Sequence, residues 1–405
     1  MLDSGLRCGR TANMLTNRDH YELTALRRDL HRRPEISGQE AETAAAIKLA
    51  LTRMKPTQVI DGLGGHGVAA VFDSGADGPT VLFRAELDAL PIHEVSDNAW
   101  RSQIDGKGHL CGHDGHMVML LGLGRLLSRQ PIAAGRVVLM FQPAEEDGSG
   151  ARAVVADPAY AQIAPDYAFA IHNEPGRDFG HVSTRVGLIN CASQGLAIHL
   201  SGKTAHAAEP ETGTSPAAAI ATLIPALSAL GTGGALDDDF RLVTVTHVNI
   251  GEASFGIAPA DGVIFATLRA ADDGNMAGMV QAARDLAQTT AAAHDLRLRL
   301  EDHDVFAASV NDAEATQIAR TAMDAIGVSH GEDDLPMRAS EDFGVFGWGA
   351  KAAMLCLGPG RDYAALHNPD YDFPDELIPV GVSIFDRIAR DLLGTAPAQS
   401  DKIRD

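Results

Sequence analysis

An α/β fold with an inserted α+β domain is predicted by two patterns in this 405-residue sequence. In the first pattern, helical segments separate short apolar runs, and each run leads into residues that bind metals or move protons. The runs are Thr80 to Phe83, Arg136 to Phe141, Tyr167 to Ile171 and Ala352 to Leu357. Such runs are typical of buried strands in a sheet that has helices on both faces. Because sites in open α/β sheets form outside the carboxyl ends of strands, the residues that follow the runs should meet at one edge.

The second pattern covers residues 190–308, where strands with one polar face are expected. Leu296, Leu298 and Leu300 alternate with Arg297 and Arg299, which is the period of a half-exposed strand. The expected strands are Leu196 to Ser201, Leu242 to Ile250, Val263 to Ala270 and Leu296 to Glu301, with helices from Ser215 and from Asn275 to His294. We therefore predict a disordered leader over 1–17, a first domain over 18–189 and 309–405, and an inserted domain over 190–308.

The N-terminal part predicts two helices. The first should run from Asp19 to His31, before Pro34. Ser37 and Glu40 have the spacing of a capping box for an alanine-rich helix that ends near residue 54. Residues 1–13 contain no apolar segment behind a basic start, so we expect no signal peptide, and Met14 is an alternative start.

Two glycine-containing motifs fail as phosphate-binding sites because their context is wrong. Gly62, Gly64 and Gly67 fit GxGxxG, but the strand-like VAAVF follows them, so a hairpin is expected. The SGKT stretch that begins at Ser201 lacks the earlier P-loop glycine, because Ala197 occupies that position.

Composition excludes several classes of partner. The net charge of −21 argues against nucleic acids and anionic membrane surfaces as partners. No stretch has the length and apolarity of a membrane span. The cysteines, Cys8, Cys111, Cys191 and Cys356, match no disulfide or zinc-ribbon spacing, so we expect reduced thiols and a cytoplasmic protein.

The densest chemistry lies between residues 108 and 117, which read GHLCGHDGHM. Cys111, His113 and His116 together favour a metal or catalytic site, because a core strand would not concentrate such groups. Asp114 has the position of a helix N-cap before the apolar run that starts at Met117. We therefore expect a turn that leads into a helix.

Glu145 and Glu146 follow the second apolar run, and neighbouring side chains there point in different directions. One carboxylate can bind a metal while the other acts as a general base. His172 and His367 occupy similar positions after two other runs, which makes them candidate ligands.

Six motifs carry a resemblance to a known family. They are FRAELDALPI from Phe83, HLCGHDGH from His109, FQPAEE from Phe141, SGKTAHAAEPETGTSP from Ser201, SEDF from Ser340 and LHNPDYDF from Leu366. In this order they resemble the M20 metallopeptidase superfamily, and within it the amidohydrolase branch of hippurate hydrolases, N-acyl amino acid deacylases and auxin-conjugate hydrolases. The resemblance extends from about residue 19 to residue 393.

The resemblance implies a zinc-peptidase-like mixed sheet flanked by helices, with a ferredoxin-like insert that acts as a lid and forms homodimers. It implies two divalent metal ions, which the residues leave open among Zn, Mn, Co and Ni. The implied metal ligands are Cys111, His113, Glu146, His172 and His367. Glu145 corresponds to the general base, and His206 to a lid histidine that reaches a substrate oxygen, often in the partner subunit's site.

Other positions depart from the family pattern or are weaker candidates. Glu86 replaces the first metal histidine of the wider superfamily, while Asp88 is kept, as is usual in the amidohydrolase branch. Gly256 replaces a lid asparagine, so the polar contacts of the lid with substrate should differ. Asn249 and Arg338 are further candidates for substrate binding, and a surface salt bridge is the alternative for Arg338.

We therefore expect a metal-dependent hydrolase of linear amides that acts on N-acyl amino acids or similar small conjugates. A dipeptidase of the same superfamily is the nearest alternative. Two others are a cysteine amidase with Cys111 as nucleophile and His113 or His116 as base, and a non-catalytic metal-binding or scaffold protein.

Overall fold

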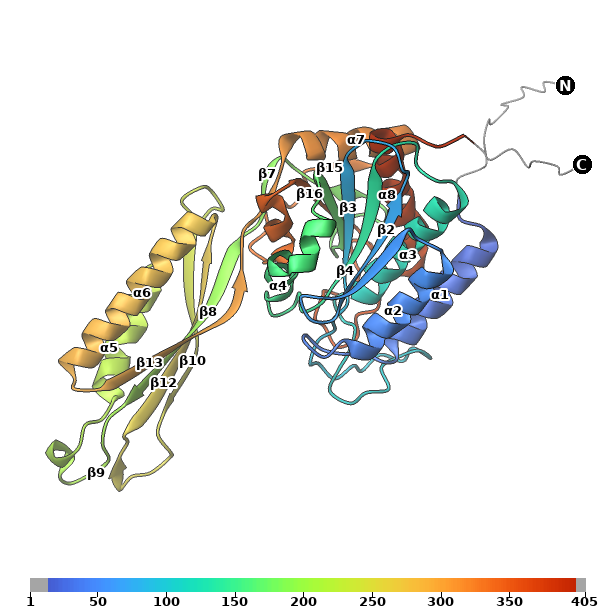
Figure 1. Cartoon of the computed structure of the whole chain (residues 1–405). Helices are drawn as coiled ribbons and strands as arrows, with labels where there is room; N and C mark the ends of the chain where they lie inside the picture. The colour runs from blue at the N-terminus through green and yellow to red at the C-terminus, as the bar shows by residue number, and fades with distance from the viewer. Residues whose placement is uncertain (1–13, 398–405) are drawn as a thin grey trace, which may run out of the picture.

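The computed structural model describes residues 14–397, which form two lobes joined by extended chain (Figure 1). The larger lobe contains an eight-stranded sheet in the order β1-β2-β4-β3-β5-β16-β6-β15. Its strands are β1 (Gln58–Leu63), β2 (Gly67–Asp73), β3 (Thr80–Glu86), β4 (Arg136–Gln142), β5 (Tyr167–Asn173), β6 (Val182–Ser183), β15 (His330–Gly331) and β16 (Lys351–Leu357). The four predicted runs are β3, β4, β5 and β16, which lie parallel to one another at the centre of this sheet.

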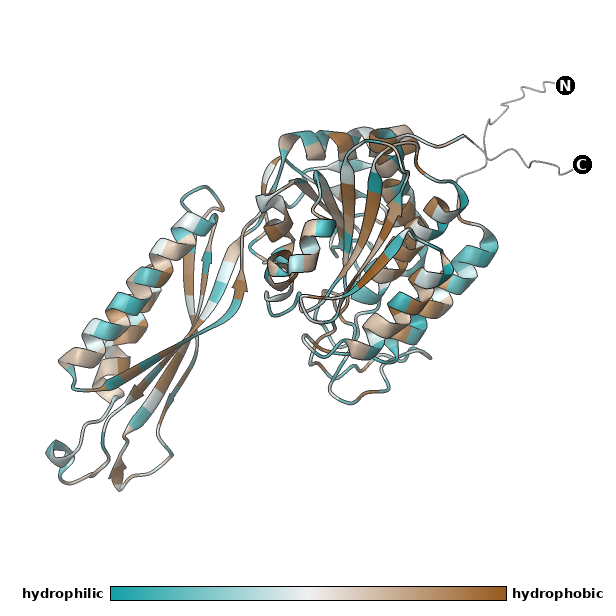
Figure 2. Ribbon diagram, viewed as in Figure 1, coloured by the Kyte–Doolittle hydropathy of each residue, from teal (hydrophilic) through white to brown (hydrophobic). Residues whose placement is uncertain are grey.

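Helices cover both faces of the large sheet, as predicted. They are α1 (Asn17–His31), α2 (Ala41–Arg53), α3 (His113–Arg129), α4 (Gly150–Ala156), α7 (Ala313–Ile326) and α8 (Ile378–Leu393), with short 3-10 segments at Pro158–Gln162, Asp342–Trp348 and Asp375–Leu377. In β4, Val137 and Leu139 pack toward α1, α3 and α8, whereas Val138 and Met140 face α4 and the 3-10 segment at Asp342–Trp348. This alternation explains why the central strands are apolar on both faces (Figure 2).

The N-terminus differs from the expectations in two places. Of the predicted leader, residues 1–13, with Cys8, lie outside the described residues, but α1 already begins at Asn17, because Thr16 and Asp19 form a reciprocal capping box. The capping box predicted from Ser37 and Glu40 is wrong. The Ser37 hydroxyl donates to Asp88 instead.

Glu35, rather than Ser37, serves the start of α2. Its carboxylate accepts hydrogen bonds from the backbone amides of Glu42 and Thr43, at 3.3 and 2.7 Å. The glycine-rich turn between β1 and β2 is the expected hairpin, with Gly62 and Gly64 at positive φ.

The smaller lobe has the predicted four strands and two helices. Its elements are β8 (Ala192–Ser201), α5 (Ala217–Ser228), β10 (Arg241–Ile250), β12 (Asp261–Ala270), α6 (Asp273–Ala293) and β13 (Arg297–Phe306). The antiparallel order β10-β12-β8-β13 with both helices on one face is ferredoxin-like (Figure 1). Helix α5 starts at Ala217 with Pro216 as N-cap, two residues later than expected, and a two-stranded ribbon joins β9 (Ala205–His206) to β11 (Ile257–Ala258).

Two strands connect the lobes. The chain leaves the larger lobe after β7 (Gly187–Asn190) and returns with β14 (Ser309–Asn311), and these two strands pair with each other. Among residues 14–397, no helix is long and apolar enough to cross a membrane.

Candidate metal centre and catalytic cavity

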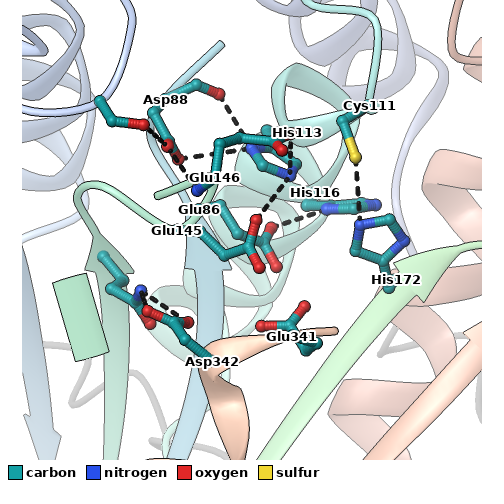
Figure 3. Close-up of polar contacts among 12 residues, drawn as sticks. Glu86, Asp88, Cys111, His113, His116, Glu145, Glu146, His172, Glu341 and Asp342 are labelled. Carbon is teal, nitrogen blue, oxygen red and sulfur yellow. Dashed lines mark hydrogen bonds and ion pairs between the residues drawn. The ribbon is translucent and has the colours of Figure 1, made fainter. Parts of the chain in front are cut away.

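The carboxyl ends of the parallel strands meet as predicted and bring distant residues together (Figure 3). Glu86 ends β3, Glu145 and Glu146 follow β4, and His172 lies near the end of β5. His367 comes from the loop after β16, where its φ is +66°.

The turn before α3 adds Cys111 and His113 to this edge. Gly112 is the N-cap, with φ of +91°, and a Cβ at this position would collide with the side chain of Asn173. The prediction that Asp114 caps the helix is therefore wrong. Asp114 lies in the first turn, fully buried, where it bonds to Nδ1 of His31 at 2.9 Å and to Arg27 at 3.2 Å.

The predicted ligands lie close enough together for several of them to bind the same ion. Ligand atoms of Cys111, His113 and His172 lie within 4.8 Å of one another, and so do those of Cys111, Glu146 and His367. The Cys111 thiol is 3.5 Å from Nε2 of His172. Nε2 of His367 is 3.6 Å from a Glu146 oxygen, so Cys111 and Glu146 link both halves of the cluster.

Hydrogen bonds orient the ligand atoms toward the centre of the cluster. Nδ1 of His113 donates to the Asp88 carbonyl at 2.8 Å, and Nδ1 of His172 donates to the Asn173 carbonyl at 2.7 Å. Nε2 of His113 and one oxygen of Glu146 are buried without any hydrogen-bond partner. Buried polar atoms without partners are costly, and thiol, imidazole and carboxylate together suit transition metals, so these residues fit divalent ions.

The remaining motif residues support the cluster. His116 uses both ring nitrogens, for Glu86 at 2.7 Å and for Asn173 at 2.7 Å. Asp88 accepts from the backbone amide of Glu146 at 2.9 Å, which fixes that residue's position. Glu86 is held by Arg84 and His116.

The pKa values in the cluster reflect burial and mutual charge. Burial opposes the charge of His113, but Asp88, Glu86 and Glu146 outweigh it and raise its pKa to about 10. Burial raises the pKa of Glu146 to about 7 and that of the Cys111 thiol well above its ordinary value. Cations or protons must therefore compensate the negative charge of this cluster.

The Glu145 carboxylate lies beside the predicted ligands and accepts no hydrogen bond from the described residues. One of its oxygens is 3.9 Å from Nε2 of His113. Burial, followed by the charges of Glu341, Glu146 and Asp342, raises its pKa well above the ordinary value. A carboxylate with a raised pKa next to candidate metal ligands is suited to proton transfer.

Three residues of this edge had no predicted role. Arg84 is fully buried and donates to Glu341 at 2.9 Å and to Asp342 at 2.7 Å, so it balances carboxylates that face Glu145. Glu341 and Asp342 belong to the SEDF motif, which was the only signal for them in the sequence.

A cavity of about 500 Å³ opens over the cluster. Cys111, Glu145, Glu146, His172 and His367 line one side, and Arg269, from β12 of the smaller lobe, lines another. Arg269 is half-buried and donates to the Arg338 carbonyl at 2.7 Å and to the Ser340 hydroxyl at 2.8 Å. Arg338 itself is exposed, donates to the Gly234 carbonyl at 2.5 Å and does not line the cavity.

The lid candidates lie away from the cluster within this chain. His206 is exposed on β9, at the end of the smaller lobe that is remote from the larger one (Figure 1), and its Nδ1 accepts from the Ala208 amide at 3.1 Å. Asn249 is exposed on β10 and lines a groove of about 820 Å³ on the smaller lobe. Gly256 lies in the same tip, and its carbonyl accepts from the Ala207 amide.

Comparison with known proteins identifies the family. Residues 82–391 match the model of peptidase family M20/M25/M40, so the chain belongs to this family. It is a metal-dependent amidohydrolase with the fold of that family, whose solved members include a dinuclear metal-binding peptidase.

Several of the named relatives are hydrolases of the amidohydrolase branch. The chain is 30% identical to the hippurate hydrolase of Campylobacter jejuni, covering 91% of this chain and 96% of that protein. It is 31% identical to the N-acetyl-L-cysteine deacetylase of Bacillus subtilis, covering 88% and 85%. A solved structure of a Bacillus subtilis dinuclear metal binding peptidase from the M20 family superposes with a TM-score of 0.76 at 26% identity, covering 94% of this chain and all of that one.

Proposed function

We propose that this protein hydrolyses the amide bond of N-acyl amino acids, which releases a carboxylic acid and an amino acid. The main supporting observation is the cavity that contains both Glu145, beside the candidate metal ligands, and the guanidinium of Arg269. The hippurate and N-acetylcysteine hydrolases among the relatives act on amides of this chemical class.

Cys111, His113, Glu146, His172 and His367 would hold two divalent ions, for which Zn, Mn, Co and Ni are the candidates. When bound, such ions polarise the carbonyl and acidify water. Glu145 would remove a proton from the attacking water and return it to the leaving nitrogen. Arg84 would keep Glu341 and Asp342 engaged, so that Glu145 is the carboxylate left free for this transfer.

Arg269 would bind the substrate carboxylate. Its fork has donors beyond those used for Arg338 and Ser340, and bidentate guanidinium–carboxylate pairs give orientation as well as affinity. Because Arg269 belongs to the smaller lobe, the substrate would contact both lobes.

His206 would donate to the developing oxyanion of a partner subunit, since it lies far from the cluster of its own chain. The exposed apolar side chains at the same tip, Phe255 and Ile257, and the open edge strands β10 and β13 support a homodimer formed through the smaller lobe. A monomer in sedimentation at micromolar concentration would contradict this assembly. The unpaired thiols of Cys111, Cys191 and Cys356 support the reducing cytoplasm as the location.

A hydrolysis screen tests the proposed function. N-acyl amino acids and dipeptides that share an amino acid are compared with protein reconstituted separately in Zn, Mn, Co and Ni. We expect faster cleavage of the N-acyl compounds, and preference for the free amino terminus would favour the dipeptidase instead. Full activity after chelation would favour the cysteine amidase, because a thiol nucleophile needs no metal.

A further inference from the structure

Glu174 occupies a wall of the catalytic cavity and has no part in the proposed reaction. It lies one residue beyond β5, and its backbone amide still donates to the Leu357 carbonyl at 2.8 Å, so the extended pairing with β16 continues. Side chains two apart in an extended strand point to the same side. The Glu174 side chain therefore lies on the same side of the chain as His172.

The carboxylate of Glu174 is not saturated by the protein. Its side chain is 24% exposed, and among residues 14–397 no donor forms a hydrogen bond to it. The nearest cation is Nη1 of Arg177 at 3.8 Å, which is beyond hydrogen-bond range. Arg177 is directed elsewhere, to the Ser183 hydroxyl at 2.9 Å and to the sulfur of Met337. Arg177 thus balances the charge of Glu174 but leaves its acceptor sites open.

Two charged groups of the cavity wall, Arg269 and Glu174, are complementary in their hydrogen bonding. Arg269 can only donate hydrogen bonds, and Glu174, when ionised, can only accept them. A half-buried carboxylate without a donor is unfavourable when a substrate covers it with apolar groups. The wall therefore suits a substrate that carries both a carboxylate and an additional N–H donor.

We propose that Glu174 is a specificity-determining residue that accepts a hydrogen bond from an ammonium group on the substrate, apart from the scissile amide. This inference rests on the proposed function, because it names the class of N-acyl amino acid that the site prefers. The ammonium group belongs either to the side chain of a diamino acid or to an amino-substituted acyl group.

Two isosteric substrate pairs distinguish these sources. The first compares N-acetyl-ornithine with N-acetyl-norleucine, and the second compares N-(4-aminobutanoyl)-norleucine with N-pentanoyl-norleucine. We expect wild type to prefer the ammonium compound of one pair by about tenfold or more in kcat/KM, and Glu174→Gln to abolish most of that preference. The change should appear mainly in KM, because the contact is present before and during the reaction.

Glu314→Gln is the matched control, because Glu314 is an exposed carboxylate on α7 outside the cavity. It should leave both ratios unchanged. If Glu174→Gln does not fold, Glu174→Asp keeps the charge beside Arg177 and should still lower the ratio through its shorter reach. Wild-type ratios within twofold in both pairs, or a preference that survives in the Glu174 variants, would overturn the proposal.

Failure of the proposed function can be distinguished from failure of this inference. If wild type cleaves none of the four compounds with any metal, calorimetry with the products of both pairs decides the role of Glu174: L-ornithine is compared with L-norleucine, and 4-aminobutanoate with pentanoate. Tighter binding of the ammonium compound of either pair by wild type, lost in Glu174→Gln, would support it, and equal affinities in both pairs would end it.

Discussion

The strand edge of the larger lobe and the tip of the smaller lobe hold their candidate functional groups in opposite ways. At the strand edge of the larger lobe, most of the candidate groups are buried, and several are fixed by hydrogen bonds, as in the bond from His113 to the Asp88 carbonyl, whereas His367 is exposed. At the tip of the smaller lobe, His206 is exposed and bonds only to a neighbouring backbone amide. Buried groups keep their positions through packing, whereas exposed groups acquire a defined position only when another surface covers them. The larger lobe therefore holds the candidate metal ligands in defined positions within one chain, and the tip requires closure or a partner.

The largest effect should come from changes within the buried cluster. Glu145→Gln should lower kcat by about a hundredfold to ten-thousandfold and retain metal, because it removes the proton carrier and leaves the proposed ligands intact. Cys111→Ala and Glu146→Gln should instead lose metal, as elemental analysis after dialysis would reveal. Full metal occupancy and a normal rate in Cys111→Ala would remove Cys111 from the site.

The exposed tip is tested by His206→Ala. We expect a loss of about a hundredfold to a thousandfold in kcat, with little change in KM or metal content, because one oxyanion donor is removed. Mixing inactive Glu145→Gln with inactive His206→Ala protomers should restore activity, since a heterodimer has one site with both native groups. A dead mixture of confirmed heterodimers would restrict His206 to its own subunit.

The buried support behind the cluster has its own pH dependence. Burial opposes the charge of His31, but Asp114 and Glu94 outweigh it and raise its pKa from 6.5 to about 9. The protonated form is thus favoured by folding, so its contribution, about 3 kcal/mol, is complete below pH 6.5 and is lost as pH rises through 9.

Urea denaturation of wild type and His31→Gln across this pH range measures the effect. The stability difference between them should shrink as pH rises. The exposed His93→Gln variant should follow wild type, and a difference between wild type and His31→Gln that is independent of pH would contradict the prediction.

The smallest effect is expected at Arg269, the residue of the smaller lobe that lines the cavity. Arg269→Ala should raise KM for N-acyl amino acids by about tenfold to a hundredfold, because a charge-assisted pair to the substrate carboxylate is lost. Substrate amides without that carboxylate should be hydrolysed equally by both proteins. Arg338→Ala, which removes an exposed guanidinium two residues from Ser340, is the control, and an equal loss in both variants would argue against a specific role for Arg269.

Local sequence was sufficient for much of the larger lobe. The four central strands were predictable because continuous apolar runs are required for strands buried on both faces. The density of ligand types around Cys111 and the adjacent pair Glu145 and Glu146 identified the candidate site. Residues that are neighbours in the sequence stay close together in any fold, so these groups could be recognised without the structure. Helix capping was less predictable. Aspartate is a residue type that is common at N-cap positions, but Asp114 is instead buried in the first turn of α3, where it pairs with Arg27 and His31.

Only the tertiary structure decided which residues from distant parts of the sequence come together at the cavity. Arg269 lies on a strand whose pattern indicates only a half-exposed sheet, and its position beside Ser340 depends on the orientation of the two lobes. Arg84 and Glu341 are 257 residues apart, and only the packing of the sheet against the following 3-10 segment joins them. The sequence determined the elements and the chemistry within each motif, because periodicity and spacing act locally. The cavity was decided by packing, because contacts between distant segments depend on the whole fold.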